Sequence, residues 1–445
     1  MLGGGGFRTP LVYQALLRDR GEPRVTEVVL HDNDLDRLAS MEVILKQLAD
    51  GHDDPPRVLS DTSLPAAIEG SDFIFAAIRV GGLDGRRCDE HVALAHGVLG
   101  QETTGPGGVA YAIRTVPVMM EIARLARELA PNAYLLNFTN PAGIITEAMQ
   151  SVLGDRVLGI CDTPSEMGRR VAAALGLDPG RVQLDYVGLN HLGWLRRVLF
   201  KGADVLPRLL ADDDLMATLE EAQVFGVDWV RALGVLPNEY LWYYYCTREA
   251  VQAINDAGET RGDYLARTQR EFFGAVRDAG PGAADLWRRA VSSRSASYLA
   301  EAKGTSGGTG QHLAPDPSDQ GYAGVALGVM AAIARDERAT LILNVRNGNT
   351  VTGLPSDAVV EVPTLVDGNG VHPLSLTQPD LAQLGLMQQV KAVERHAIAA
   401  ATTGSRDEAL LALALHPLVD SVSVARKLLA GYLDRIPEVA RVLTA

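Results

Sequence analysis

Apolar and polar positions follow two different spacings along the first third of the chain. Short runs of β-branched and other apolar residues predict strands, at residues 25–30, 58–60, 73–79, 133–137 and 157–160. Apolar residues at helical spacing predict helices between them, at residues 9–17, 35–48 and 112–129. Strands that alternate with helices indicate βαβ units. The pattern therefore predicts an α/β fold with a parallel sheet.

The pattern changes after residue 161. A helix is predicted at 165–175 and a strand at 184–186, and the acidic stretch 207–222 is typical of a solvated helix or an insertion. The Gly-, Ser- and Pro-rich segment 304–319 predicts a mobile loop. After it we expect a helix at 322–334, strands at 340–346 and 358–363, and a helical region that begins near Pro379 and breaks at Gly404.

Charge and composition exclude several classes of protein. The chain has 41 Lys+Arg against 55 Asp+Glu, a net charge of −14, and no run of basic residues, which excludes a nucleic-acid binder. The longest apolar stretch has about 13 residues where a membrane span needs about 18, and the N-terminus lacks the features of a secretory signal. We therefore expect a cytoplasmic protein without membrane contact.

The chain begins with a glycine cluster that runs into a predicted helix: Gly3, Gly4, Gly5 and Gly6. Glycines at a strand-to-helix turn allow close approach of a pyrophosphate, which the helix N-terminus stabilises. Asp32 ends the next strand, where an acidic residue would bind the ribose hydroxyls of NAD. A flexible, tag-like N-terminus is the alternative, and Asp32 favours the dinucleotide site.

One feature conflicts with this interpretation. A dinucleotide-binding turn follows a strand, and only Met1 and Leu2 precede the glycines. Either the numbered start truncates the natural one or the first strand is missing, and we expect the former.

Polar clusters follow two other predicted strands. Residues 78–82, Arg86, Asp89, Glu90 and the loop 100–108 come after the strand at 73–79, at the carboxyl end where open α/β sheets bind ligands. They are simple turns or, as we favour, contacts to a polyhydroxylated or anionic ligand. Two asparagines follow the strand at 133–137 and either cap the next helix or bind sugar hydroxyls: Asn137 and Asn140.

Three cysteines are too few for a disulfide framework. One of them, Cys161, precedes Asp162 at a strand end, and His191 follows about 30 residues later. A thiolate and an imidazole, with substrate oxygens, suit a divalent transition metal, although a buried Cys and a satisfied His are the commoner outcome. The aromatic segment 236–245 indicates core packing, or a base at Tyr240 if a metal lowers its pKa.

With these motifs in place, the chain resembles glycoside hydrolase family 4, the NAD-dependent glycosidases that include 6-phospho-β-glucosidases, 6-phospho-α-glucosidases, α-galactosidases and α-glucuronidases. The shared motifs run from the glycine turn through RVGG, GQETTGPGG, LNFTNPAG, GICD, GLNH and LPNEYL to VVEVP. The resemblance implies a Rossmann-like NAD-binding domain (1–165) and an α+β catalytic and oligomerisation domain (166–445), as in lactate and malate dehydrogenases. It also implies a homodimer or homotetramer.

The resemblance assigns roles to single residues. Cys161 and His191 match ligands of a divalent metal, usually Mn²⁺, Tyr240 matches the base, and Asp162 matches the general acid proposed in α-specific members. Arg86 and Asn140 match substrate contacts, and Arg261 matches an arginine near the sugar phosphate. The expected NAD contacts are Gly3, Gly4, Gly5, Gly6, Asp32 and Arg79. At Gly6 and Phe7 the chain departs from the many members that have small hydroxyl residues there.

The implied activity is hydrolysis of 6-phospho-β-glucosides. In the mechanism that the resemblance implies, NAD takes hydride from C3 of the sugar, the metal polarises the ketone, and Tyr240 removes the C2 proton. Elimination then breaks the glycosidic bond, water adds, and the hydride returns to C3. A 6-phospho-α-glucosidase or other α-glycosidase of the family, a sugar or 2-hydroxyacid dehydrogenase, and a sensor without catalysis remain alternatives.

Overall fold

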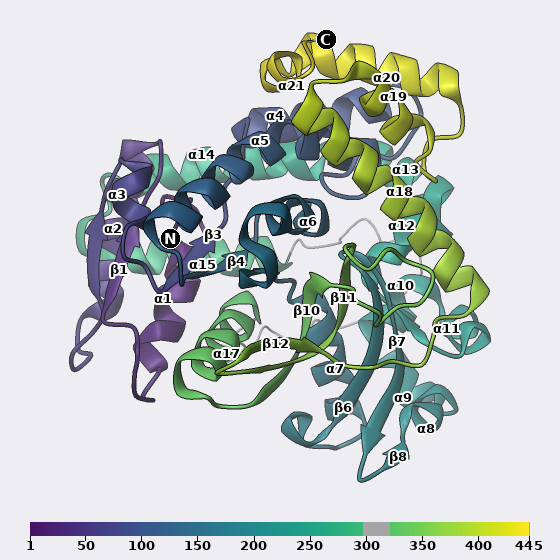
Figure 1. The fold of residues 1–445 in the computed structure, drawn as a ribbon, viewed down its shortest axis with the longest axis horizontal. Helices are drawn as coiled ribbons and strands as arrows, with labels where there is room; N and C mark the ends of the chain where they lie inside the picture. Colours follow the sequence, from purple (N-terminus) through teal and green to yellow (C-terminus); the bar gives the residue numbers. More distant parts are fainter. Residues whose placement is uncertain (297–320, 445) are drawn as a thin grey trace.

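The computed structural model describes residues 1–296 and 321–444, so the loop predicted at 304–319 lies outside the described residues (Figure 1). The five strands predicted in the first third are present, with ends within three residues of the predicted ones: β1 (Glu27–Leu30), β2 (Arg57–Ser60), β3 (Phe73–Ala76), β4 (Tyr134–Asn137) and β5 (Val157–Gly159). β1 pairs with β2, β3 with β4 and β4 with β5, all in parallel. The α/β prediction is confirmed.

The place of the central strand is taken by a single residue. Leu2 forms parallel bridges with His31 and with Ala76, and its amide donates to the carbonyl of Phe75 at 2.8 Å. The strand order is thus β2, β1, Leu2, β3, β4, β5, which is the doubly wound order of dinucleotide-binding sheets. Because one residue makes no ladder, β1 and β2 form a sheet of their own.

Helices connect these strands; α3 (Leu64–Ile68) and α4 (Gly82–Leu94) were not predicted, α6 (Ala142–Leu153) was expected without bounds, and α5 (Pro106–Leu129) begins earlier than predicted. α1 (Thr9–Arg18), α2 (Leu35–Ala49), α3 and α6 flank the sheet, while α5 begins six residues before the predicted start. Its first turn needs glycine, since a Cβ on Gly108 would lie 2.0 Å from the carbonyl oxygen of Thr103. The cluster around Arg86, expected in a ligand-binding loop or turn, instead forms α4.

The sheet continues into the second half of the chain. β10 (Ala339–Arg346) pairs antiparallel with β5, followed by β11 (Val359–Asp367), β6 (Gln183–Leu189), β7 (Leu192–Phe200) and β8 (Ala203–Asp204). Two short strands pair beside this path, β9 (Leu236–Pro237) with β7 and β12 (Gly370–Pro373) with β11. α7 (Thr163–Ala174) and α17 (Gly321–Arg335) match the predicted helices. The division into domains at residue 165 stays a prediction.

The acidic stretch 207–222 is neither a single solvated helix nor an appended insertion. It forms most of three short helices, α8 (Leu206–Leu210), α9 (Asp213–Ala217) and α10 (Glu220–Phe225). Leu209, Met216 and Leu219 are buried in one cluster with Leu195 and Val198 of β7. The acidic residues thus cover one side of helices whose other side packs on the sheet. Further helices follow: α11 (Val227–Leu233), α12 (Trp242–Tyr245), α13 (Thr247–Asp256), α14 (Arg261–Val276) and α15 (Ala283–Ala296).

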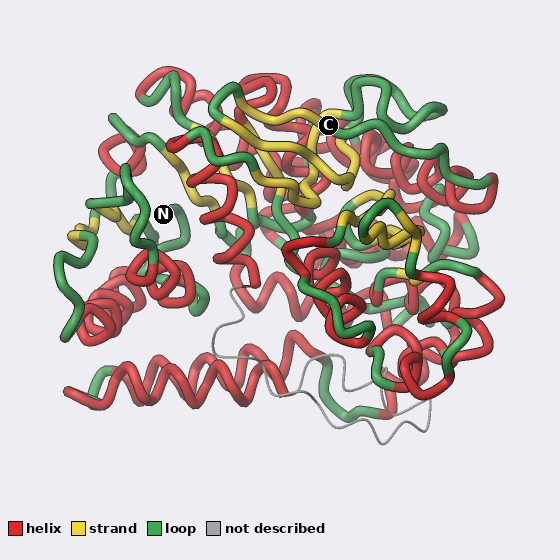
Figure 2. Tube along the Cα trace, turned by 90° about the horizontal axis from the view of Figure 1, so that it is seen from below, coloured by secondary structure: helices red, strands yellow, loops and turns green. Residues whose placement is uncertain are grey.

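The end of the chain returns to the first part of the fold. α18 (Leu381–Thr403) begins after the capping residue Asp380 and ends at Gly404, close to the predicted limits. With α19 (Arg406–Ala414), α20 (Val422–Arg435) and α21 (Pro437–Val442), it lies over α4 and α5 (Figure 1). These helices share one hydrophobic core with α5, α6 and β4, and helices flank the strands in the perpendicular view (Figure 2). Within the described ranges no helix is long and apolar enough to cross a membrane.

Candidate active site

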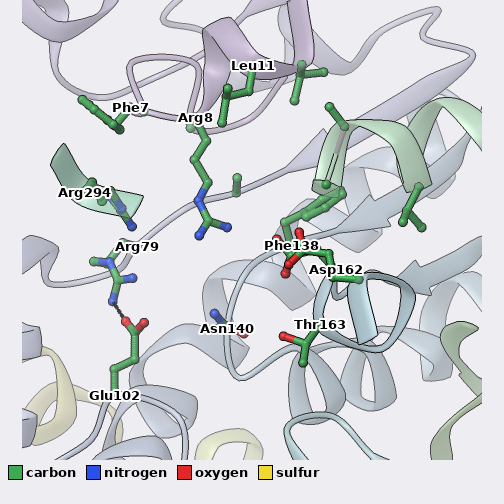
Figure 3. A pocket seen from close by; sticks show the side chains of 18 of the residues that line it. Phe7, Arg8, Leu11, Arg79, Glu102, Phe138, Asn140, Asp162, Thr163 and Arg294 are labelled. Carbon is green, nitrogen blue, oxygen red and sulfur yellow. Dashed lines mark ion pairs between the residues drawn. The ribbon is translucent and has the colours of Figure 1, made fainter. Parts of the chain in front are cut away.

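A cavity of about 2750 Å³ opens beside the carboxyl ends of the parallel strands. Most of the predicted site residues line it: Gly3, Gly6, Asp32, Arg79, Arg86, Asn140, Asp162, Tyr240 and Arg261. Gly4 and Gly5 lie within the glycine turn, and Cys161 and His191 are buried. The fold thus gathers residues from positions 3 to 261 around one space, part of which is shown in Figure 3.

The glycine turn is tightly packed, which excludes a flexible, tag-like N-terminus. A Cβ on Gly3 would lie 2.5 Å from the carbonyl oxygen of Ala77, and one on Gly4 would lie 2.8 Å from Cβ of Leu30. The amide of Gly5 donates to Oδ2 of Asp32 at 2.9 Å, so the predicted ribose-binding residue also closes the turn. The turn leads into α1 beside the cavity. These residues fit a dinucleotide, because the start of α1 lines the cavity and a helix N-terminus stabilises a pyrophosphate.

Hydrogen bonds connect the loop 100–105 to Nδ1 of His191. Oε1 of Gln101 accepts the backbone amides of Thr103 and Thr104, both at 2.6 Å, so this atom is the carbonyl oxygen. The hydroxyl of Thr103 lies 3.1 Å from the same oxygen and 2.9 Å from Nδ1 of His191. Because Nδ1 is occupied by this contact, Nε2 is the ring nitrogen that remains for a metal.

His191 itself is buried and uncharged near neutral pH. It lies in the turn between β6 and β7 with a φ of 62°. Burial lowers its pKa to about 4, with smaller effects of Glu102, which raises it, and Arg8, which lowers it. The ring is neutral near pH 7, and a neutral imidazole with Nε2 unprotonated is the form that ligates metals.

Cys161 lies at the end of β5 in a negatively charged environment. Burial raises the pKa of its thiol well above the ordinary value, and the charges of Glu361 and Asp162 raise it further. Glu361 is fully buried and accepts hydrogen bonds from Asn344 at 2.9 Å and from Asn190, the neighbour of His191, at 3.4 Å. A divalent cation would relieve this concentration of negative charge and favour the thiolate.

The described residues hold no group of three or more His, Cys, Asp or Glu side chains arranged for a metal ion. A site built on Cys161 and His191 thus needs further ligands from outside the protein, such as the substrate oxygens that the sequence analysis expects. The two donors, a thiol and an imidazole, fit a divalent transition metal.

Tyr240 lies directly against His191. The two rings are stacked, with centroids 3.7 Å apart and planes 2° apart. Asn238 holds the backbone amide of Tyr240 through Oδ1 at 3.0 Å and donates to the hydroxyl of Tyr186 at 3.1 Å. Other aromatics of the segment, Trp242 and Tyr243, are core residues, as the simpler interpretation of the cluster expects. Tyr240 differs because it lines the cavity beside a candidate metal ligand, where a cation would favour the phenolate.

The two asparagines have different roles. The Asn137 side chain is fully buried, donates to the carbonyl of Thr139 at 3.2 Å and accepts the amide of the same residue at 3.0 Å. It therefore holds the turn before α6. Asn140 lines the cavity and is open to a ligand (Figure 3).

Arginines gather at one side of the cavity. Nη1 of Arg79 and Nη1 of Arg86 pair with Oε2 of Glu102 at 2.7 and 2.8 Å. Although burial opposes ionisation, these two arginines lower the pKa of Glu102. Figure 3 shows Arg8 and Arg294 on the same side of the cavity as the ion pair of Arg79 with Glu102.

The pKa of Arg294 reflects the neighbouring positive charges. Burial, followed by the positive charges of Arg8, Arg261 and Arg86, lowers its pKa to about 9. Nη2 of Arg261 also donates to the carbonyl of Arg294 at 3.1 Å. A group of arginines around one side of a cavity, in a chain of net charge −14, indicates an anionic ligand.

Sequence reasoning gave no individual role to four residues of this site: Arg8, Glu102, Thr103 and Arg294. Arg8 lies two residues after the glycine cluster and could have been found there. Glu102 and Thr103 lie within the recognised GQETTGPGG motif. Arg294 lies on α15 outside any motif, so no local signal pointed to it.

Comparison with known proteins gives consistent matches. Residues 1–177 match the model described as family 4 glycosyl hydrolase, and residues 186–419 match the C-terminal domain of that family. The 6-phospho-β-glucosidase BglT of Thermotoga maritima is 30% identical over 435 residues, which cover 98% of this chain and 97% of that protein.

Solved structures agree. A 6-phospho-β-glucosidase from Thermotoga maritima, solved with NAD and glucose-6-phosphate, has a TM-score of 0.81 at 29% identity and 98% coverage of both chains. A 6-phospho-α-glucosidase from gut microorganisms, solved with NAD and Mn²⁺, has a TM-score of 0.81 at 27% identity, with 97% of this chain and 96% of that chain covered.

Proposed function

The chain belongs to glycosyl hydrolase family 4, and on this premise we propose that it hydrolyses 6-phospho-β-glucosides with a resident NAD and a divalent metal, Mn²⁺ in the first place. The observation that carries the substrate class is the group of arginines at one side of the cavity, where the positive charges of Arg8, Arg86 and Arg261 act on Arg294. A phosphate dianion on the sugar would be stabilised there. The similar enzymes solved with glucose-6-phosphate support the same choice.

Other residues in and beside the cavity would bind the two cofactors. The glycine turn, Asp32 and Arg79 would hold the dinucleotide, and Cys161 and His191 would hold the metal. When bound, NAD supplies a reversible hydride acceptor and the metal supplies a Lewis acid.

The residues of the chain then divide the proton transfers between them. Tyr240 would remove the proton from C2 of the sugar, and the stacking of its ring on the proposed metal ligand His191, with centroids 3.7 Å apart, supports this role. Asp162 lines the cavity after Cys161 and would protonate the departing oxygen. Asn140 and Arg86 would orient the sugar.

A 6-phospho-α-glucosidase is the second candidate, and Asp162 is the residue that favours it, since α-specific members resemble this chain at that position. Cytoplasmic location and assembly into a homodimer or homotetramer are further parts of the proposal. Size-exclusion chromatography with light scattering tests the assembly.

The decisive experiment is an activity panel of α- and β-nitrophenyl glucosides, each with and without a 6-phosphate, assayed with NAD and Mn²⁺. We expect turnover of the phosphorylated β-glucoside without net accumulation of NADH. Turnover of the α-anomer only would select the second candidate. Stoichiometric NADH formation without release of nitrophenol would reject a glycosidase in favour of a dehydrogenase.

A further inference from the structure

One buried carboxylate connects two arginines of the cavity. Glu90 lies on α4 and is 1% exposed. Its Oε1 accepts a hydrogen bond from Nε of Arg86, one turn earlier on the same helix, at 2.8 Å. Its Oε2 accepts the backbone amide of Gly262, in the first turn of α14, at 2.7 Å. Each oxygen of Glu90 thus holds a different helix segment that faces the cavity.

The contact with α14 is specific for glycine. Gly262 directly follows Arg261, the first residue of the helix. A Cβ on Gly262 would lie 2.6 Å from Oε2 of Glu90 and 3.3 Å from Cγ of Arg86, so a side chain would separate the two helices. The amide that Glu90 accepts is one that has no partner within its own helix, and the positive end of the helix dipole favours the carboxylate.

The two arginines are therefore held relative to one another. The guanidinium of Arg86 forms ion pairs with Glu90 through Nε and with Glu102 through Nη1, each at 2.8 Å. Arg261 precedes the amide that Glu90 fixes, and its guanidinium lies 4.9 Å from the ring centroid of Tyr264. A shift of α14 away from α4 would move Arg261 but leave Arg86 with its second carboxylate.

A second contact joins the same helices outside the cavity. Asp263 pairs with Arg87 at 2.6 Å and with His91 at 2.7 Å, through side chains of Arg87 and His91 that are 43% and 44% exposed. His91 neighbours Glu90 on α4 and contributes to the docking of α14. It provides a matched control, because its loss weakens the helix contact without removing a partner of Arg86.

We propose that Glu90 is a positioning residue that sets the spacing of Arg86 and Arg261 and thereby selects substrates that carry a phosphate dianion. This inference rests on the proposed function and deepens it. Glu90 acts through the two arginines, so it contributes to the binding of the phosphorylated sugar rather than to the proton transfers.

The test compares Glu90→Gln with His91→Gln in the full-length protein. Glutamine keeps one acceptor oxygen but presents an NH₂ group to the other donor, so either Arg86 or the amide of Gly262 loses its contact. By calorimetry with NAD and Mn²⁺ present, we expect Glu90→Gln to weaken glucose 6-phosphate binding by about 10- to 100-fold. KM for the phosphorylated substrate should rise in parallel, with kcat within about threefold. His91→Gln should keep both values within about twofold.

The inference is overturned if Glu90→Gln binds glucose 6-phosphate like the wild type. It is also overturned if the affinities for NAD and for glucose 6-phosphate fall equally, because that pattern indicates general loss of structure. If Glu90→Gln does not fold, Gly262→Ala provides the test, because its Cβ displaces the Glu90 carboxylate without removing it. We expect Gly262→Ala to weaken glucose 6-phosphate binding by the same factor as Glu90→Gln.

A failure of the proposed function would look different. In that case the wild type itself does not bind glucose 6-phosphate, and the phosphate selection is overturned with it. Hydrogen exchange of residues 260–264 then still tests the positioning role. Faster exchange in Glu90→Gln than in His91→Gln supports that role, and equal exchange contradicts it.

Discussion

Substitution of Thr103 by valine tests the candidate metal site through a residue that touches neither metal nor substrate. Valine has nearly the shape of threonine, so the change removes the hydroxyl between Nδ1 of His191, at 2.9 Å, and Oε1 of Gln101, at 3.1 Å. Without this partner Nδ1 of His191 loses its hydrogen bond, so the imidazole is held less firmly for ligation through Nε2. The metal would then compete with a proton and with rotation of the ring.

The expected loss follows from the two hydrogen bonds. Each is worth about 0.5–1.5 kcal/mol, and removing the partner of a metal-binding histidine typically lowers metal affinity by about 10- to 100-fold. We therefore expect the Kd for Mn²⁺ to rise by about 10- to 100-fold in Thr103→Val. The stacking of Tyr240 on His191 should limit the disorder of the ring and keep the loss within that range.

Titration of Mn²⁺ followed by the electron paramagnetic resonance of the unbound ion measures this Kd in the presence of NAD. Thr115→Val is the matched control, because the Thr115 hydroxyl is buried and has no hydrogen-bond partner among the described residues. It should bind Mn²⁺ like the wild type. Wild-type affinity in Thr103→Val would refute the role of Thr103 in holding His191 for the metal.

Three further predictions concern the base, the anion site and a buried histidine. Tyr240→Phe keeps the ring stacked on His191 but removes the phenol, so exchange of the sugar C2 proton with solvent deuterium should stop and kcat should fall at least about 100-fold; continued exchange by NMR would identify another base. Arg294→Gln should raise KM for the phosphorylated glucoside about tenfold and leave binding of NAD unchanged, and an unchanged KM would exclude Arg294 from the phosphate site. Burial lowers the pKa of His416 to about 3 from 6.5, so its contribution to stability is present above pH 6.5 and is lost as the pH falls toward 3. Urea unfolding at pH 7.0 and 4.5 should show about 2–3 kcal/mol less loss of stability in His416→Gln than in the wild type, and equal losses would contradict the assignment.

The local pattern of the sequence was sufficient for the strands of the first third and for α1, α2, α7 and most of α5. Short β-branched runs form β1 to β5 with small errors at their ends. The pattern gave no helix at α3 or α4, no bounds for α6 and a late start for α5. In α4 and at the start of α5, glycines disfavour a helix in isolation. Those glycines are required by contacts that form only in the folded protein, such as the approach of Gly108 to the backbone of Thr103.

The missing first strand shows the same limit. From the sequence alone, two residues before a glycine turn cannot make a strand. In the fold, Leu2 fills the position between β1 and β3 through backbone hydrogen bonds on both sides. Backbone hydrogen bonds to β3 and to the residue after β1 hold Leu2 in place, as the ladder of a longer strand would.

By itself the sequence determined the family motifs and the chemistry at the strand ends, because a glycine turn, a Cys-Asp pair and an Asn-His turn are each recognisable within a few residues. Only the tertiary structure decided how these groups are oriented and which others join them. Thr103 contacts Nδ1 of His191 across 88 positions of the chain, and Arg294 joins Arg8 from a helix without any motif. Such contacts depend on where the folded backbone places each side chain, and local propensity carries no information about the distance between side chains that are far apart in the sequence.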